Sequence, residues 1–490
     1  MFLQKKERTV LLFLFLSYFI VRLLLVSYAP FVRDESYYAM MINEQIEHPT
    51  IIPTFMGHDT GWKPTAFFWI YAFFVNVLKN LSISLEAVYR LPTEIFGIIN
   101  VFLLFYLVKK LTKSFEIATI TSLIYNFTFL VIYVNNTVLT DTLLNTFILA
   151  ALLSYFSDQL GHRRFFLAFI FSSLAFLVKL VMAFIIPVLA VIYFLVDNNR
   201  STLKNPYFLF SLLSVPLTML TYNSFYTDPT ILEGMYKGDI SSKFLYSYDI
   251  QTIVGIFYSS FVPLFSLAGI WFFLSLGGFL RHWRNNLFMA FWFILILIPL
   301  LSAPFLPWYF LTVIPPVCYF AALFLVYDEN KKVRLDTFFK TILFIFIVAS
   351  FLLGFWWYST LKEDFEFGRM IGTSLAGIDN VAFIGTFAPE MIAYKVLEEQ
   401  RHGMKIDYGW ILIENITKDS PVPFVENYWH EDENVAEDSF FRMMWDKNKV
   451  FRKSAKIYNF DYIVLIGLQN TSIQGEVLYN STKTLVVKIR

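Results

Sequence analysis

A succession of apolar runs, each long enough to cross a lipid bilayer, constrains this chain more than any other feature. A helix needs roughly 20 apolar residues to cross about 30 Å of hydrocarbon. Such runs lie at about 9–29, 91–109, 115–134, 139–157, 165–179, 181–196, 207–226, 253–280, 286–303, 305–327 and 337–358. Only 16% of the 490 residues are charged, against about 25% in a soluble chain. The sequence therefore predicts a polytopic α-helical membrane protein with about eleven transmembrane helices.

Two apolar pieces need separate treatment. The first run is expected to stay as an anchor and not to be removed as a signal peptide, because no small-residue cleavage site follows it. The piece from Pro64 to Leu78 is too short to span and lies between Lys63 and Lys79. We expect it to form a helix at the membrane interface within the first outer loop.

Positive residues gather in cytoplasmic loops, which makes the topology testable. With the N-terminus in the cytoplasm, every inner loop is basic. The inner residues are Lys5, Lys6 and Arg8; Lys109, Lys110 and Lys113; Arg163 and Arg164; Arg200 and Lys204; Arg281 and Arg284; and Lys331, Lys332 and Arg334. A crossing at Pro64 to Leu78 would destroy this agreement. The outer face then receives 30–90, 227–252 and 360–490.

The chain changes character near residue 360, where charged and amide residues return to soluble frequencies. We expect a transmembrane domain over 1–359 and an extracytoplasmic α/β domain over 360–490. Its alternating apolar pattern predicts strands at 381–386, 410–414 and 462–466, a helix at 389–400 and a hairpin at 475–488. Asn415, Asn470 and Asn480 each begin an N-glycosylation acceptor sequence.

Several function classes find no support in the sequence. The net charge is +1, so nothing predicts a nucleic-acid partner. The one cysteine, Cys318, can form no intrachain disulfide and is expected to be a buried apolar residue. No Gly-rich phosphate loop and no Cys/His cluster occurs, so no cofactor is predicted.

Charged residues from distant parts of the chain fall at the outer ends of the predicted spans. They are Asp34, Glu35, His58, Asp59, Lys63, Arg90, Asp141 and Lys179. Charges near hydrocarbon are expensive and commonly mark functional sites. We expect these side chains to share one depth at one membrane face. Acids and bases gathered there predict a site for a charged group carried by a lipid, and a lipid phosphate fits best.

Such a site has a definite chemistry. Lys63, Arg90 and Lys179 supply cationic donors for a phosphate. Transfer of a sugar from that phosphate needs a base for the proton of the acceptor hydroxyl, and an ionised Asp34 or Glu35 supplies it. An inverting displacement also requires the base and the leaving phosphate on opposite sides of the sugar.

Five motifs in one order carry a family resemblance. They are Asp34-Glu35, Trp62-Lys63-Pro64-Thr65-Ala66-Phe67-Phe68-Trp69, Arg90-Leu91-Pro92, Thr140-Asp141-Thr142-Leu143-Leu144 and Phe176-Leu177-Val178-Lys179. This series resembles the C-type (GT-C) polytopic membrane glycosyltransferases, in particular the dolichyl-phosphate-mannose protein mannosyltransferase and aminoarabinose transferase group. The resemblance covers roughly residues 9–200 and thins afterwards.

The resemblance implies a polyprenyl-monophosphate sugar donor, an inverting transfer to a hydroxyl of a protein, lipid or glycan, and catalysis at the extracytoplasmic face. It implies that Asp34 is the catalytic Asp and that Asp141 is a second acid. Lys63 and Lys179 would contact the donor phosphate, together with Tyr309. Relatives often have an Arg-Tyr pair at this position, where this chain has Trp308 and Tyr309. Relatives have a second proline where Thr65 stands and a glutamate two residues before Lys63. Because this chain lacks both, a divalent metal is not supported.

Weaker expectations and rival interpretations stand beside this hypothesis. Tyr236 and Lys237 lie in the loop 227–252, which could close over the donor as a lid, while Tyr37 and His58 accompany the acids of the first loop. Asp34 could instead cap the helix that follows it. The whole chain could be a transporter or flippase of a lipid-linked sugar, or a non-catalytic subunit of a glycan-assembly complex. Neither an internal repeat nor midplane charges favour the transporter.

Overall fold

The computed structural model divides into two compact units. It describes residues 5–23, 25–55, 58–59, 64–197, 200–226, 268–301, 307–326, 341, 344–345, 348–349, 352–353, 355–356, 359, 366, 368–377, 381–385, 389–402, 412–414, 462–466, 476–480 and 484–488. The helical unit comprises Met1–Ala29, Pro49–Pro53 and Gly61–Lys362. The sheet unit comprises Pro30–His48, Thr54–Thr60 and Glu363–Arg490.

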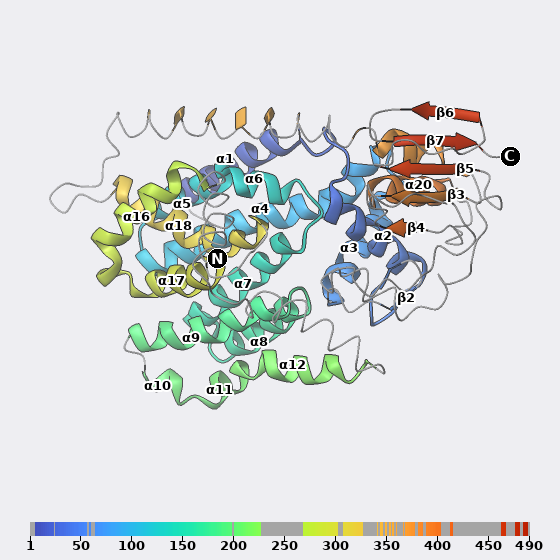
Figure 1. Cartoon of the computed structure of the whole chain (residues 1–490). Helices are drawn as coiled ribbons and strands as arrows, with labels where there is room; N and C mark the ends of the chain where they lie inside the picture. The colour runs from blue at the N-terminus through green and yellow to red at the C-terminus, as the bar shows by residue number, and fades with distance from the viewer. Residues whose placement is uncertain are drawn as a thin grey trace, which may run out of the picture. The chain divides into compact units, whose positions relative to one another are not determined.

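The helical unit is built around the long helix α4. Its elements are α1 (Lys5–Leu23), α3 (Ala66–Leu78), α4 (Leu85–Thr112), α5 (Phe115–Phe127), α6 (Phe129–Asn135), α7 (Thr140–Phe156), η1 (Asp158–Leu160), α8 (Arg163–Phe176), η2 (Val181–Phe184), α9 (Ile185–Val196), α10 (Arg200–Leu203), α11 (Pro206–Leu212), α12 (Ser214–Asn223), α16 (Ile270–His282), η4 (Trp283–Asn285), α17 (Leu287–Leu301), η5 (Pro307–Val313) and α18 (Ile314–Val326). Helix α4 contacts α1, α5 and α7, while α8 lies between α7 and the pair α11 and α12 (Figure 1).

Local sequence explains why α4 and α5 are separate helices. The Ser84 hydroxyl accepts the Ala87 N–H and caps the start of α4. The helix ends at Lys113, whose φ of 55° takes the chain out of the helix. Ser114 then caps α5 by accepting the Ile117 N–H. This short connection turns α5 back along α4.

The structure contains fewer clear spans than the sequence predicts. Among the described residues, Leu85–Thr112 and Trp308–Val326 are long and apolar enough to cross a membrane, and the bent pair α5 and α6 would make a third span. Eleven spans are therefore not shown. Hydropathy reports only that a run is apolar, so it cannot separate one continuous helix from two: the predicted span 207–226 is formed by α11 and α12. The predicted spans 253–280 and 337–358 fall largely outside the described residues.

The predicted span 115–134 is broken by a bend of 62° between α5 and α6. Thr128 takes an extended conformation at the break, which leaves carbonyl groups at the end of α5 without helical partners. The Arg22 guanidinium of α1 donates to one of them, the Asn126 carbonyl, at 2.8 Å. The Thr128 hydroxyl donates to the Ile124 carbonyl. The bend is thus stabilised by polar side chains buried in protein.

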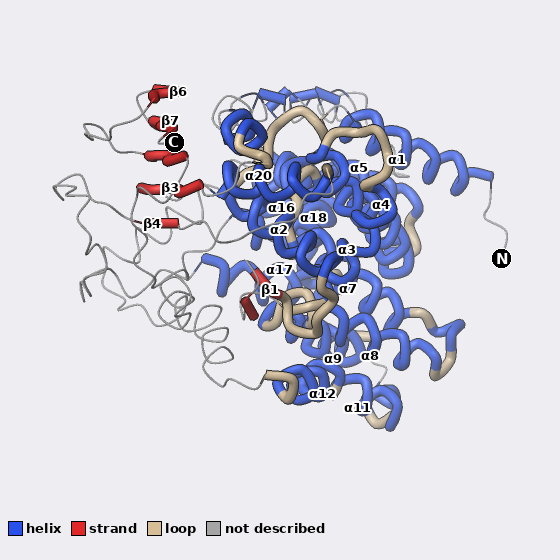
Figure 2. The backbone as a smooth tube through the Cα atoms, turned by 90° about the vertical axis from the view of Figure 1, so that its right-hand side faces the viewer, coloured by secondary structure: helices blue, strands red, loops and turns tan. Residues whose placement is uncertain are grey.

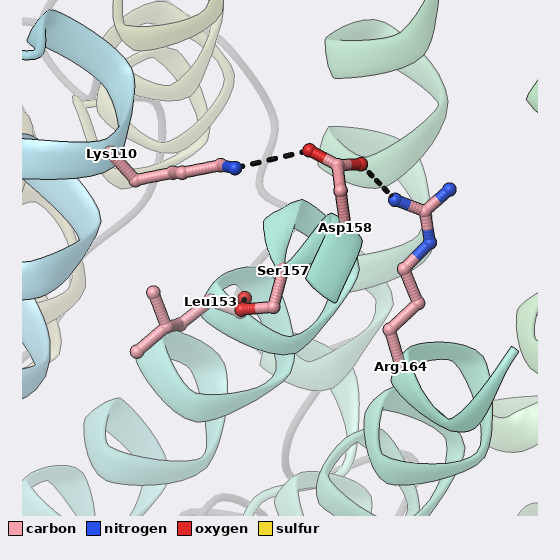
Figure 3. Close-up of polar contacts among 5 residues, drawn as sticks. All are labelled: Lys110, Leu153, Ser157, Asp158 and Arg164. Atoms are coloured by element: carbon pink, nitrogen blue, oxygen red, sulfur yellow. Dashed lines mark hydrogen bonds and ion pairs between the residues drawn. The ribbon is translucent and has the colours of Figure 1, made fainter. Parts of the chain in front are cut away.

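Basic residues meet acidic partners at one end of the helical unit, which we call the Lys110 end. Figure 3 shows the side chains of Lys110, at the end of α4, and Arg164, at the start of α8, pointing to the two carboxylate oxygens of Asp158 in η1. Lys109 pairs with Glu7 near the start of α1. The predicted inner loops after α4 and α7 therefore lie at the same end as the start of α1.

Asp158 is mostly exposed in this cluster. Partial burial alone would raise the pKa of its carboxyl, but the hydrogen bonds and charges of Lys110 and Arg164 outweigh that effect and lower the pKa. The ion pairs thus favour the charged carboxylate in the folded protein.

The described part of the sheet unit contains a five-stranded mixed sheet, a two-stranded hairpin and helices, among them one at 368–374. The elements are α2 (Arg33–Glu47), β1 (Thr54–Phe55), β2 (His58–Asp59), β3 (Val381–Gly385), α20 (Pro389–Arg401), β4 (Leu412–Glu414), β5 (Tyr462–Ile466), β6 (Glu476–Asn480) and β7 (Thr484–Lys488). The strands of the sheet lie side by side in the order β4-β3-β5-β7-β6 (Figure 2). Strand β3 is parallel to β4 and β5, and the other pairs are antiparallel. Strands and a helix thus occupy the positions expected between 381 and 488. Their identity as a separate domain outside the membrane stays a prediction.

Candidate active site

A buried ion pair joins two of the predicted site residues. Asp141 is the second residue of α7, and Lys179 lies in the turn that follows α8. The Lys179 Nζ donates to Asp141 Oδ1 at 2.7 Å, and the two residues are 3% and 1% exposed. Taking two charges out of water carries a large desolvation penalty, which only close pairing and hydrogen bonding offset. The position of Lys179 is therefore determined by Asp141.

Tyr309 completes this cluster from a third part of the chain. It lies in η5 and is buried, and the Lys179 Nζ stands 3.4 Å from the centroid of its ring. A cation over an aromatic face gains about 0.5–2 kcal/mol, with the larger values in desolvated sites. Asp141, Lys179 and Tyr309 thus form one charged cluster, which we call the Lys179 cluster.

The segment that carries Lys63 begins its helix beside this cluster. The Ala66 N–H, at the start of α3, donates to the carbonyl of Leu177, two residues before Lys179. Lys63 itself lies outside the described residues.

Arg90 has different partners from those expected. It is fully buried near the start of α4, and its Nη1 donates to the carbonyl groups of Val26 and Ala29 at 3.1 and 2.6 Å. These carbonyls belong to the turn after α1. The guanidinium thus fixes the main chain that leads towards Asp34, which is a structural use of its donors.

The common depth expected for Arg90 and Asp141 stays a prediction, but the two residues meet α4 at different levels. Asn100 of α4 donates to the carbonyl of Thr142, the neighbour of Asp141. Ten residues of helix separate Arg90 from Asn100, or about 15 Å along α4. Hydropathy places the ends of spans but does not give helix length or offset, and α4 extends beyond the start of α7. The Lys179 cluster therefore lies beside a later part of α4 than Arg90 does.

The two acids of the first loop lie in the first turn of α2, in the sheet unit. Glu35 is buried, and its Oε2 accepts the Val32 N–H at 3.1 Å, which caps the helix. Asp34 is half-buried. A helix N-terminus favours a negative charge there. Tyr37 packs edge-on against Phe55, with ring centroids 5.6 Å apart.

The other predicted site residues are His58, Tyr236 and Lys237. The main chain of His58 pairs with Phe55 in the β1–β2 hairpin. Tyr236 and Lys237 fall outside the described residues, so the lid stays a prediction. No group of three or more His, Cys, Asp or Glu side chains suited to a metal ion occurs within the described part of the chain.

Sequence reasoning missed a second buried polar group, formed by α1 and α4. The Tyr18 hydroxyl donates to Glu94 Oε2 at 2.7 Å, and the Arg22 guanidinium lies over the Tyr18 ring. All three side chains are buried. Arg22 and Glu94 could have pointed to this group, because they lie inside predicted spans, where charged residues are rare and costly.

Comparisons with known proteins agree with this architecture. Residues 62–222 match the sequence profile of the dolichyl-phosphate-mannose-protein mannosyltransferase family. A comparison with curated protein sequences finds no match. ArnT from Cupriavidus metallidurans bound to undecaprenyl phosphate superposes with a TM-score of 0.66 at 13% identity, over 99% of this chain and 98% of that one. Its apo form gives 0.64 at 13% identity over the same shares.

An archaeal enzyme shares the same fold. The oligosaccharyltransferase of Archaeoglobus fulgidus, tethered to an acceptor peptide, gives a TM-score of 0.53 at 13% identity, over 94% of this chain and 69% of that one. At these identities the structural matches show the fold alone. Together with the family match, they make this chain an integral membrane protein with the C-type glycosyltransferase fold. Residues 62–222 are similar to the mannosyltransferase family, a family of glycosyltransferases, which confirms the resemblance predicted from the motifs.

Proposed function

We propose that this protein transfers a sugar from a polyprenyl monophosphate to an acceptor hydroxyl at the extracytoplasmic membrane face, with inversion at the anomeric carbon. The observation that carries the proposal is the Lys179 cluster, a charged group buried inside a helical membrane unit. A match to ArnT, which is solved bound to undecaprenyl phosphate, supports a polyprenyl phosphate as the ligand. The family name supports mannose as the first sugar to test.

Lys179 and Lys63 bind the donor phosphate in this proposal. An ammonium group has three N–H donors, of which Asp141 takes one in Lys179. The carboxylate of Asp141 orients the ammonium, and the Tyr309 ring covers it from another side. The Ala66–Leu177 hydrogen bond joins the start of α3 to the turn that carries Lys179. Two cations then neutralise the charge that grows on the leaving phosphate.

Asp34 acts as the general base. The base must be ionised to take the proton of the acceptor hydroxyl, and the first turn of α2 favours a carboxylate. Glu35 uses an oxygen to cap the helix, so its role is to orient this turn. In an inverting displacement Asp34 approaches the sugar from the side opposite the phosphate.

The Lys110 end supports the proposed orientation. It gathers the basic loop residues after α4 and before α8, and such residues favour the cytoplasm. The start of α7 and the end of α8, which carry the Lys179 cluster, then face the other side. The N-terminus is cytoplasmic in this orientation, and the C-terminal segment is extracytoplasmic.

The test compares two neighbouring acids in the purified full-length protein. The probe is radiolabelled polyprenyl-phosphate mannose, and the readout is label transferred to protein, glycolipid and glycan fractions of the cell envelope. Asp34→Asn should lower turnover at least about 100-fold, since it removes the base, and should leave binding of the donor unchanged. Glu35→Ala should lower thermal stability while turnover stays measurable. Near-normal turnover of Asp34→Asn would falsify the proposed role of Asp34.

A further inference from the structure

The C-terminal segment contacts the main chain directly before the helix that carries Asp34. The Phe31 N–H donates to the hydroxyl of Tyr394, on α20, at 2.9 Å. The two rings stack with centroids 5.3 Å apart at an angle of 29°. Both side chains are buried, at 0% and 1% exposure. One side chain of α20 thus holds the chain three residues before Asp34 by both a polar and an apolar contact.

The next main-chain N–H, that of Val32, has its acceptor within α2. The Val32 N–H donates to Glu35 Oε2, within the first turn of α2. N–H groups at the start of a helix have no helical acceptor, so side chains decide how they are satisfied. Phe31 and Val32 are therefore fixed by Tyr394 and Glu35, which sets the direction of the turn in which Asp34 lies.

Tyr394 is itself rigidly supported. Residues 368–374 form a helix that packs against α20 at Gly372, where a Cβ atom would overlap the Met391 carbonyl oxygen and lie 2.7 Å from the Tyr394 Cβ. Further along α20, the Glu399 carboxylate accepts the Gly377 N–H at 3.0 Å and pairs with Lys395. The close packing at Gly372 and the hydrogen bond from Gly377 thus fix α20 against the segment 368–377.

We propose that Tyr394 is a positioning residue for the transfer reaction: its hydroxyl and ring fix the main chain at Phe31, and thereby the Asp34 carboxylate. The proposal rests on the role of Asp34 as the base. It gives the C-terminal segment a part in catalysis, because a base displaced by about 1 Å can lose a large factor in rate. Tyr394 acts through the main chain and does not touch the substrate.

The experiment changes two residues of α20, one that contacts the chain just before α2 and one that contacts the end of α2. Tyr394→Phe keeps the stacked ring and removes only the hydroxyl. Gln400→Ala is the matched control, since Gln400 Nε2 donates to Glu47 Oε1 at the far end of α2. With polyprenyl-phosphate mannose as the probe, Tyr394→Phe should lower kcat about tenfold and leave the KM for the donor within twofold. Gln400→Ala should change neither.

Hydrogen exchange supplies a readout that does not depend on turnover. In Tyr394→Phe, peptides that cover residues 28–36 should exchange at least tenfold faster, while peptides from α4 should not change and so report an intact fold. Unchanged exchange at 28–36 would show that the Tyr394 hydroxyl does not hold the main chain at Phe31. Faster exchange with unchanged kcat overturns the positioning role. Normal turnover of Asp34→Asn would refute the base and leave the exchange result standing, so the two failures are distinguishable.

Discussion

At the scale of single residues, the structure gives the two acids and the cations of the predicted site distinct roles. Asp141 and Lys179 form a buried pair, and Arg90 is bound to carbonyl groups of the turn after α1. Glu35 caps the helix in which Asp34 lies. Residue type and spacing predicted these side chains as candidates. They could not predict these partners, because hydrogen-bond partners depend on the packing of segments far apart in the sequence.

Breaking the buried pair should be costly. Asp141→Asn leaves the Lys179 ammonium buried without its counter-charge and should lower the free energy of unfolding by about 3–5 kcal/mol. The double variant Asp141→Asn with Lys179→Met removes both charges and should lose clearly less than the sum of the single losses. Denaturant unfolding in detergent micelles measures all three. Additive losses would show that the two side chains do not interact.

The cluster at the Lys110 end should show a small pH-dependent effect. The folded-state pKa of Asp158 is lowered, so its contribution is complete above the unfolded pKa of about 3.9 and is lost as the pH falls through the lower folded value. At pH 7, Asp158→Asn should lower stability by a few tenths of a kcal/mol, as is usual for exposed pairs. Thermal unfolding at pH 7 and pH 3 measures the difference, which should be smaller at pH 3. An equal or larger difference at pH 3 would contradict the ion-pair origin.

At the scale of elements, helix positions were more predictable than helix continuity. The apolar runs at 91–109 and 305–327 correspond to Leu85–Thr112 and Trp308–Val326, whereas the run at 115–134 is bent by 62°. Hydropathy averages over a window, so a single extended residue such as Thr128 leaves almost no trace in it. Arg22 also stabilises the bend by its hydrogen bond to the Asn126 carbonyl. The two residues are far apart in the sequence, so the sequence does not predict this contact.

The close approach of α16 and α18 predicts opposite outcomes at two adjacent glycines. A Cβ at Gly278 would overlap the main-chain carbonyl oxygen of Phe320, whereas a Cβ at Gly277 would meet the ring of the partly exposed Phe324 at 2.8 Å. Gly278→Ala should therefore destabilise the protein by about 1–3 kcal/mol. Gly277→Ala should be near neutral, because the ring can turn away and alanine favours the helix by about 1 kcal/mol. Thermal unfolding of both variants tests this, and equal losses would contradict it.

At the scale of the whole molecule, the fold of the C-type glycosyltransferases extends over nearly the full chain, although the family profile covers only residues 62–222. The two compact units divide at Lys362 and Glu363, close to the boundary expected near residue 360, but the second unit also takes in part of the first loop. Residues 30–48 and 54–60, from the first loop, group with the C-terminal segment. Composition marks where a chain becomes soluble in character, but it cannot reveal that an early loop packs on a late helix.

Cysteine labelling can test the orientation of the membrane unit. Cys318 is fully buried, so the parent protein should react little with a membrane-impermeant thiol reagent. Leu81, before α4, and Leu160, in η1, are 50% and 40% exposed at opposite ends of the unit. In intact cells Leu81→Cys should be labelled, and Leu160→Cys should be labelled only after permeabilisation. The reverse pattern would invert the topology.

The sequence by itself determined that this chain is an apolar, helical membrane protein with acids and cations suited to a lipid phosphate, because hydropathy, charge and motif order are properties of local sequence. The tertiary structure decided which of those groups meet. The pairing of Asp141 with Lys179 under the ring of Tyr309, the binding of Arg90 to carbonyl groups and the contact of Tyr394 with Phe31 all join distant segments. Such contacts arise only when helices pack, since the desolvation of each buried charge must be offset by a partner that another segment supplies.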